Sequence, residues 1–130
     1  MKKVLLDTNA YTALLAGDET VLTIIARART VYMSVFVMGE LYAGFRGGNR
    51  EQENRAVLES FLAQPTCETV TAGKETARIF GELKNNLKKA GTPLPINDVW
   101  IAAHTIEVGA TLMSYDNHFN QITGLNRWNR

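Results

Sequence analysis

The chain has little of several features that mark specialised classes of protein. Its 130 residues include one cysteine, Cys67, so no internal disulfide can form, and we expect the chain to work in the reducing cytoplasm. Fourteen Lys and Arg nearly balance thirteen Asp and Glu, which excludes a strongly basic nucleic-acid wrapper and an acidic tail protein. No apolar run approaches the ~20 residues of a membrane span. The apolar stretch after Lys2 and Lys3 is too short for a secretory signal.

The rest of the composition is that of an ordinary globular domain. Apolar residues make up 45% of the chain and charged residues 21%, both near the averages for such domains. The sequence shows no repeat, no low-complexity tract and no linker. We therefore expect one domain over residues 1–130, with a core that needs no disulfide.

Short apolar runs alternate with longer stretches of helical periodicity. We expect strands at 4–6, 30–34, 67–70 and 111–113, and a short edge strand at 126–128. Helices are expected at 10–15, after Asp18, and at 35–45, 51–63, 74–90 and 97–108, with a helical turn at 117–122. This alternation predicts an α/β fold in which helices cover both faces of a mostly parallel sheet.

Four acidic residues stand where such a sheet would gather them. Asp7 directly follows the first strand, Glu40 lies in the helix after the second, Asp98 opens the helix before the fourth, and Asp116 comes three residues after Met113. The carboxyl ends of parallel strands share one edge, where ligands bind. Taken singly, each Asp is first interpreted as a helix N-cap. Glu40 is expected to be partly buried, because its helix is almost wholly apolar; the alternative is an exposed edge of that helix.

Together these acids predict a metal site. Two carboxylates ~5 Å apart repel by roughly 3 kcal/mol at an effective dielectric constant of ~20, so a cluster of four needs neutralising charge. Nothing basic in these motifs is placed to supply it. A set of oxygen ligands suits Mg²⁺ or Mn²⁺ rather than zinc. Such ions on carboxylates are used in phosphodiester cleavage.

Nearby polar residues are candidates for supporting roles. Ser114, two residues before Asp116, could hold a water molecule or a phosphate oxygen. Asn97, or the pair Thr8 and Asn9, could orient a carboxylate by a hydrogen bond. The alternative for each is local hydrogen bonding in a turn or a cap.

Three further residues bear on RNA binding or proton transfer. Arg46, near the end of the Glu40 helix, is our preferred contact to an RNA phosphate; it could equally stabilise the C-terminus of that helix through its dipole. His104 lies two turns into its helix and is interpreted as packed or exposed. His118 is expected to fix the loop after Asp116. We assign neither histidine as a general base.

Four sequence blocks carry a family resemblance. Leu6-Asp7-Thr8-Asn9, Gly39-Glu40-Leu41, the segment 97–104 (NDVWIAAH) and the segment 114–119 (SYDNHF) occur in this order. They resemble the four blocks of the PIN-domain nucleases, and nearly the whole chain resembles the VapC-type toxins of bacterial toxin–antitoxin pairs.

This resemblance implies a three-layer fold with a parallel sheet of about five strands and a Mg²⁺-dependent endoribonuclease, with Mn²⁺ as a possible substitute, acting on tRNA or rRNA. Asp7, Glu40, Asp98 and Asp116 match the catalytic, metal-binding acids, of which the fourth is the least constant in the family, and Ser114 matches a position that is often Ser or Thr. The family forms homodimers and is neutralised by a VapB-like antitoxin, whose C-terminal segment covers the site and whose other half contacts DNA.

Two other functions stay open on the sequence. A Mg²⁺-dependent phosphatase would need a second Asp where Asn9 stands, and a receiver domain would need an acid pair at the first strand and a Lys after a late one. A catalytically inactive binding module of the same fold would have no reason to keep four mutually repelling acids.

Overall fold

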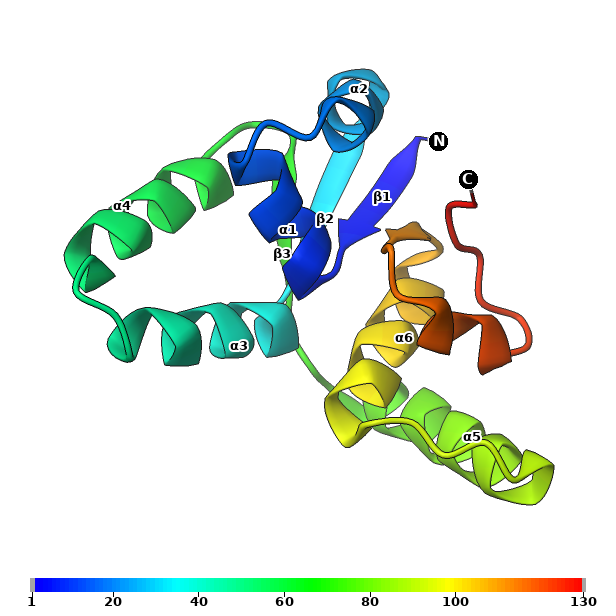
Figure 1. Cartoon of the computed structure of the whole chain (residues 1–130). Coiled ribbons are helices and arrows are strands. Elements are labelled where there is room, and N and C mark those ends of the chain that lie inside the picture. The colour runs from blue at the N-terminus through cyan, green and yellow to red at the C-terminus, as the bar shows by residue number, and fades with distance from the viewer. Residues whose placement is uncertain (1, 130) are drawn as a thin grey trace.

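The protein is built on a four-stranded parallel sheet. The structure is a computed structural model that describes residues 2–129, so the two terminal residues of the expected 1–130 domain lie outside the described residues. Strands β1 (Lys3–Leu6), β2 (Thr30–Ser34), β3 (Cys67–Val70) and β4 (Thr111–Met113) lie in the order β3-β2-β1-β4. Every neighbouring pair is parallel. The order reverses beside β1, because β2 lies on one side of it and β4 on the other (Figure 1).

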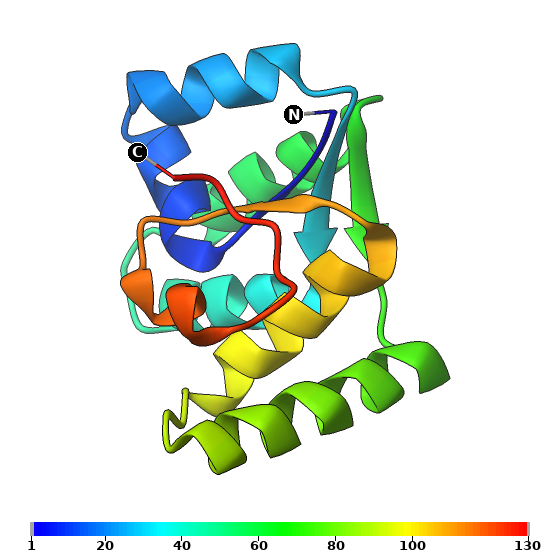
Figure 2. The same cartoon turned by 90° about the vertical axis from the view of Figure 1, so that its right-hand side faces the viewer.

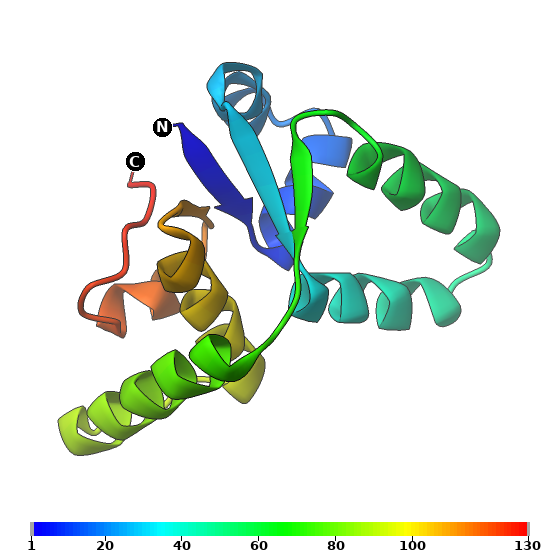
Figure 3. The same ribbon diagram turned by 180° about the vertical axis from the view of Figure 1, so that it is seen from behind.

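Helices lie on both sides of this sheet. They are α1 (Thr8–Leu15), α2 (Glu19–Arg27), α3 (Val35–Arg46), α4 (Glu51–Leu62), α5 (Lys74–Ala90), α6 (Ile96–Val108) and the short 3₁₀ helix η1 (Asn117–Gln121). Helices α1 and α4 are on one side and α6 on the other, while α5 packs along α6 (Figures 1 and 3). The predicted α/β/α class with a parallel sheet is confirmed. Within residues 2–129, no helix has both the length and the apolar character that a membrane crossing requires.

The expected strand at 126–128 is an isolated bridge instead. The N–H of Leu112 donates to the carbonyl of Asn126 at 2.8 Å, and the N–H of Trp128 donates to the carbonyl of Leu112 at 2.9 Å. Figure 2 shows the C-terminal segment running back across β4. Alternate residues of a strand direct their backbone groups to opposite sides. A strand of three residues therefore leaves only Leu112 to pair outward, and the described sheet has four strands rather than about five.

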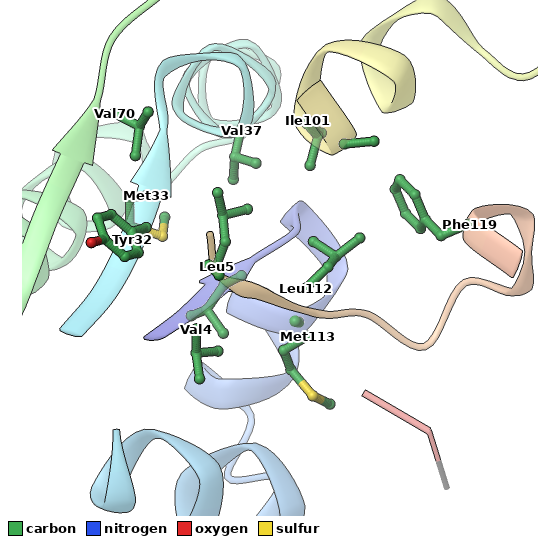
Figure 4. Packing of buried hydrophobic residues seen from close by; sticks show 14 of the residues in the cluster. Val4, Leu5, Tyr32, Met33, Val37, Val70, Ile101, Leu112, Met113 and Phe119 are labelled. Carbon is green, nitrogen blue, oxygen red and sulfur yellow. The ribbon is translucent and has the colours of Figure 1, made fainter. Parts of the chain in front are cut away.

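The core surrounds strands β1 and β4. Val4, Leu5 and Leu6 have no exposed surface, as expected for a strand covered on both faces. Figure 4 shows Val37 of α3, Ile101 of α6 and Phe119 of η1 gathered around Leu5 and Leu112. This packing fixes the strand ends from which the acidic side chains project.

The buried face of α5 differs from the one that its sequence suggests. Periodicity favours the stripe Ala77, Phe80, Leu83 or Lys84, and Leu87, whereas the buried residues are Thr76, Ile79, Leu83 and Leu87. Thr76 can be buried because its hydroxyl accepts from the N–H of Gly73 at 3.0 Å and donates to Glu107 at 2.5 Å. An apolar pattern does not include a polar side chain such as Thr76, which can be buried because both of its hydrogen bonds are made.

Candidate metal-binding active site

The strand ends at the reversal point carry the first part of the site. Asp7 follows β1, and Ser114 and Asp116 follow β4. The two strands are still joined there, since the N–H of Asp7 donates to the carbonyl of Met113 at 3.3 Å. This is the position at which open parallel sheets bind their ligands.

Asp7 is held by both of its carboxylate oxygens. Its side chain is buried. Oδ1 accepts from the N–H of Ala10 at 2.8 Å, and this hydrogen bond caps α1. Oδ2 accepts from the hydroxyl of Ser114 at 2.5 Å. The Ser114 hydroxyl also accepts from the N–H of Asp116 at 2.9 Å. Ser114 is fully buried, and its two hydrogen bonds fix Asp7 relative to the Asp116 loop.

Glu40 lies on the open rim of the site and is exposed, so the expected partial burial is wrong. Helix α3 buries Val37 and Leu41 against the core, and position 40 falls outside that face. The hydroxyl of Thr8 donates to Glu40 Oε1 at 2.5 Å and so orients this carboxylate. Asn9, the other half of the predicted pair, is exposed.

Within the described residues, neither the side chain of Asn97 nor that of Arg46 is hydrogen-bonded or ion-paired to the four acids. The side-chain amide of Asn97 donates to the carbonyl of Phe36 at 3.5 Å, so it links α6 to the first turn of α3 rather than orienting a carboxylate. Arg46 is exposed in the last turn of α3.

Asp98 and Asp116 meet above the strand ends, together with His118. Asp98 lies in the first turn of α6, whose N-cap is Pro95, so the capping interpretation is wrong for Asp98. It holds for Asp7 and for Asp116, which accepts from the N–H of His118 at 2.9 Å and caps η1. His118 Nδ1 lies 3.2 Å from Asp116 Oδ1 and 3.8 Å from Asp98 Oδ2. In the sequence, His118 follows Asp116 by two residues, and this spacing could have indicated that the imidazole lies beside the acids.

These three side chains form a compact group of possible metal ligands. One donor atom from each lies within 4.8 Å of the others, and among residues 2–129 no other group of three or more His, Cys, Asp or Glu side chains comes as close. Asp7 and Glu40 stand outside this group. The four acids are therefore arranged as a close pair, Asp98 and Asp116, with two flanking carboxylates.

The acids influence one another electrostatically. Burial raises the pKa of Asp7, and repulsion from Asp116 and Glu40 raises it further, against the opposing hydrogen bonds from Ser114 and Ala10. Burial also raises the pKa of Asp98, again with repulsion from Asp116 and Glu40, while His118 acts in the opposite direction. Side chains from four separate segments thus share one region of negative potential.

The donor set fits a hard divalent cation. Four carboxylates offer the oxygen ligands that Mg²⁺ and Mn²⁺ take. Within the described part of the chain, no Lys or Arg is ion-paired with any of the four. The side chains of Asp98 and Asp116 are 20% and 29% exposed, which leaves an open side for a substrate.

A more apolar groove lies elsewhere. It has a volume of about 520 Å³ and is lined by α5 and by the loop before α6, including Phe80, Leu87 and Leu94. None of the four acids lines it. The acidic strand ends, and not this groove, carry the groups suited to chemistry.

Known proteins resemble this chain over most of its length. The PIN domain family model matches residues 4–125. The chain belongs to the PIN-domain family. Ribonuclease VapC1 of Haemophilus influenzae strain R2866 is 31% identical over 128 residues, which cover 93% of this chain and 92% of the relative. Ribonuclease VapC2 of Rickettsia felis is 29% identical over 93 residues, covering 72% of this chain and 68% of the relative. Family membership decides against the receiver and phosphatase alternatives.

Solved structures of the PIN-domain family share the fold of this chain. A VapBC complex from Salmonella typhimurium bound to DNA matches with a TM-score of 0.86 and 24% identity, covering 98% of both chains. VapBC2 from Rickettsia felis, bound to a fragment of its promoter, matches with a TM-score of 0.85 and 24% identity, covering 98% of this chain and 99% of the other. At this identity the likeness establishes the fold.

Proposed function

We propose that this PIN-domain chain is a metal-dependent endoribonuclease toxin that cleaves cellular RNA of the tRNA or rRNA class. The observation that carries the proposal is the meeting of Asp7, Glu40, Asp98 and Asp116 at one edge of the sheet. Relatives that match most of this chain are named ribonucleases. An inactive module of this fold would gain nothing from the unrelieved repulsion.

The chain's own residues prepare the site before any substrate binds. Ser114 and the first turn of α1 hold Asp7, and Thr8 holds Glu40, so neither carboxylate has to reorganise. Asp98 and Asp116 would hold the cation, Mg²⁺ or Mn²⁺, with Asp7 and Glu40 beside them. When bound, a divalent cation supplies positive charge for the scissile phosphate and lowers the pKa of a water molecule.

RNA binding needs positive charge beyond the acids. Arg46 lies six residues after Glu40 on α3, about 9 Å further along the helix axis. Its exposure at the helix end suits a contact to an RNA phosphate near the cleavage site. This contact would add affinity without adding sequence preference.

The binding partners of this chain are inferred from its structural neighbours in the PIN-domain family. Several structural neighbours are complexes of a VapC-type chain with its antitoxin, and two are described with bound DNA. We infer a VapB-like antitoxin whose C-terminal segment covers the acidic site, so that cleavage stops when the two are bound. DNA is contacted through the antitoxin, and the toxin itself is a homodimer.

Substitution of Asp7 tests the proposal. Tag-free protein incubated with total tRNA and rRNA should cleave RNA with millimolar Mg²⁺ or Mn²⁺ and should stop when EDTA is added. Asp7→Asn keeps the shape of the side chain and removes its charge, so we expect cleavage to fall by about a hundredfold or more. Circular dichroism should show an unchanged fold.

Glu59→Gln is the matched control, because Glu59 is an exposed acid on α4, away from the strand ends. It should cleave like the parent. Equal cleavage by Asp7→Asn and the parent would refute the assignment of the acids.

A further inference from the structure

His118 is the one histidine in the described structure that could reach a bound cation. The chain has two histidines. His104 is fully buried, and its Nδ1 lies 2.7 Å from the hydroxyl of Ser34. The side chain of His118 is 58% exposed and directs Nδ1 toward the two closest acids of the site.

We propose that His118 is a direct ligand of the divalent cation, through Nδ1, together with Asp98 and Asp116. The inference rests on the proposed function, since it concerns the cation of the same site. It adds a nitrogen donor to a set that the sequence suggests is made of oxygen alone.

The distances between donor atoms match a shared cation. Metal–ligand bonds of ~2.1 Å in an octahedral site place neighbouring donor atoms ~3.0 Å apart and opposite ones ~4.2 Å apart. Nδ1 of His118 lies 3.2 Å from Asp116 Oδ1 and 3.8 Å from Asp98 Oδ2, within this range. A cation between the three atoms requires only small movements of the exposed His118 and the partly exposed Asp98 and Asp116 side chains.

The backbone holds the imidazole in this place. The N–H of His118 donates to Asp116 Oδ1 at 2.9 Å, so the residue is tied to the acid that it would share the cation with. The next residue, Phe119, is 1% exposed and anchors η1 in the core. The imidazole is therefore presented by a fixed turn, although its ring is largely in solvent.

A nitrogen ligand changes which cation the site prefers. Mg²⁺ takes oxygen ligands and keeps several waters, whereas imidazole suits first-row transition metals. A neutral imidazole also adds a ligand without adding to the repulsion among the four acids. We expect the site to bind Mn²⁺ more tightly relative to Mg²⁺ than a site made only of carboxylates would.

Electron spin echo spectroscopy of bound Mn²⁺ tests this directly. Tag-free protein with Mn²⁺ should show modulation from a directly bound ¹⁴N nucleus, and growth with ¹⁵N-histidine should change that modulation to the ¹⁵N pattern. His118→Ala should remove it and weaken Mn²⁺ affinity on the order of tenfold or more, with a smaller effect on Mg²⁺. Asn117→Ala, at the exposed neighbouring position, is the control and should keep both.

The outcomes separate the two proposals. The hydrogen bond from residue 118 to Asp116 uses the backbone, so it survives in His118→Ala and the loop should stay folded. If Mn²⁺ binds and shows no nitrogen coupling, His118 is not a ligand and the carboxylate site stands. If Mn²⁺ does not bind even at millimolar concentration, the metal-dependent function fails together with this inference.

Discussion

Asp7 is both a helix N-cap and a member of the acidic site, two roles that the sequence presents as alternatives. One oxygen caps α1 by accepting from Ala10, and the other accepts from Ser114 at the base of the acidic site. The capping interpretation and the functional interpretation are thus both compatible with the same side chain. Its burial next to other carboxylates is a cost to the folded state that a cation would relieve.

The raised pKa of Asp98 predicts a pH dependence of stability. In the unfolded chain the carboxyl titrates near 3.8, and in the folded chain higher. Between the pKa of the unfolded state and that of the folded state, the folded protein binds more protons. The free energy of unfolding therefore falls as the pH rises from the lower pKa to the higher one, and it stays lower above the higher pKa. In EDTA, the Tm of Asp98→Asn should fall less than that of the parent as the pH is raised from 3.8 towards neutrality.

Thermal unfolding at several pH values measures this difference. Glu59→Gln again serves as the control and should follow the parent. Parallel curves for Asp98→Asn and the parent would show that Asp98 carries no unfavourable charge in the folded state.

Among the elements, β2, α3 and α6 are joined by one serine. The Ser34 hydroxyl accepts from the N–H of Phe36 at 3.1 Å, capping α3, and this leaves its proton to donate to Nδ1 of His104 at 2.7 Å. Burial lowers the pKa of His104, so the ring is neutral and can accept. This junction positions α3, which carries Glu40, against α6, which carries Asp98.

Ser34→Ala should destabilise the protein by about 2 kcal/mol, because it removes a helix cap and leaves a buried ring nitrogen without its donor. Chemical denaturation measures the change. Ser60→Ala, at an exposed position of α4, should stay within about 0.5 kcal/mol of the parent. A similarly small effect of Ser34→Ala would show that the junction contributes little.

Regular elements could be predicted from the sequence where a local signal bounds them. The strands at 30–34, 67–70 and 111–113 and the helix at 74–90 have the predicted limits. The helix at 74–90 ends at Gly91, whose φ of +70° suits glycine. The first and last residues of such strands and helices depend on neighbouring residues in the chain, so they can be predicted from the sequence.

Features that depend on distant contacts could not be predicted in this way. The exposure of Glu40 depends on which face of α3 meets the core, and the missing fifth strand depends on the short length of β4. The approach of His118 to Asp98 joins residues from η1 and α6. The order of the acids along a parallel sheet, a property of topology, allowed their shared location to be predicted, and so did the resemblance of the four blocks to the PIN-domain nucleases.

At the scale of the whole molecule, the strand order gathers the site. Asp7 and Asp116 are far apart in the chain and come together because β4 pairs with β1. Helices α3 and α6 then bring Glu40 and Asp98 to the same edge. The fold thereby concentrates negative charge in one place, which would stabilise a bound cation only when the chain is folded.

Thermal unfolding with and without divalent cation tests this claim most directly. In partner-free protein, Mg²⁺ or Mn²⁺ at about a hundred times its dissociation constant should add about 2.7 kcal/mol of stability, which is a rise in Tm of roughly 10 °C for a chain of this size. The double variant Asp98→Asn, Asp116→Asn should lose that rise and, in EDTA, should unfold at a higher temperature than the parent. A parent protein whose Tm does not respond to millimolar Mg²⁺ or Mn²⁺ would contradict the account.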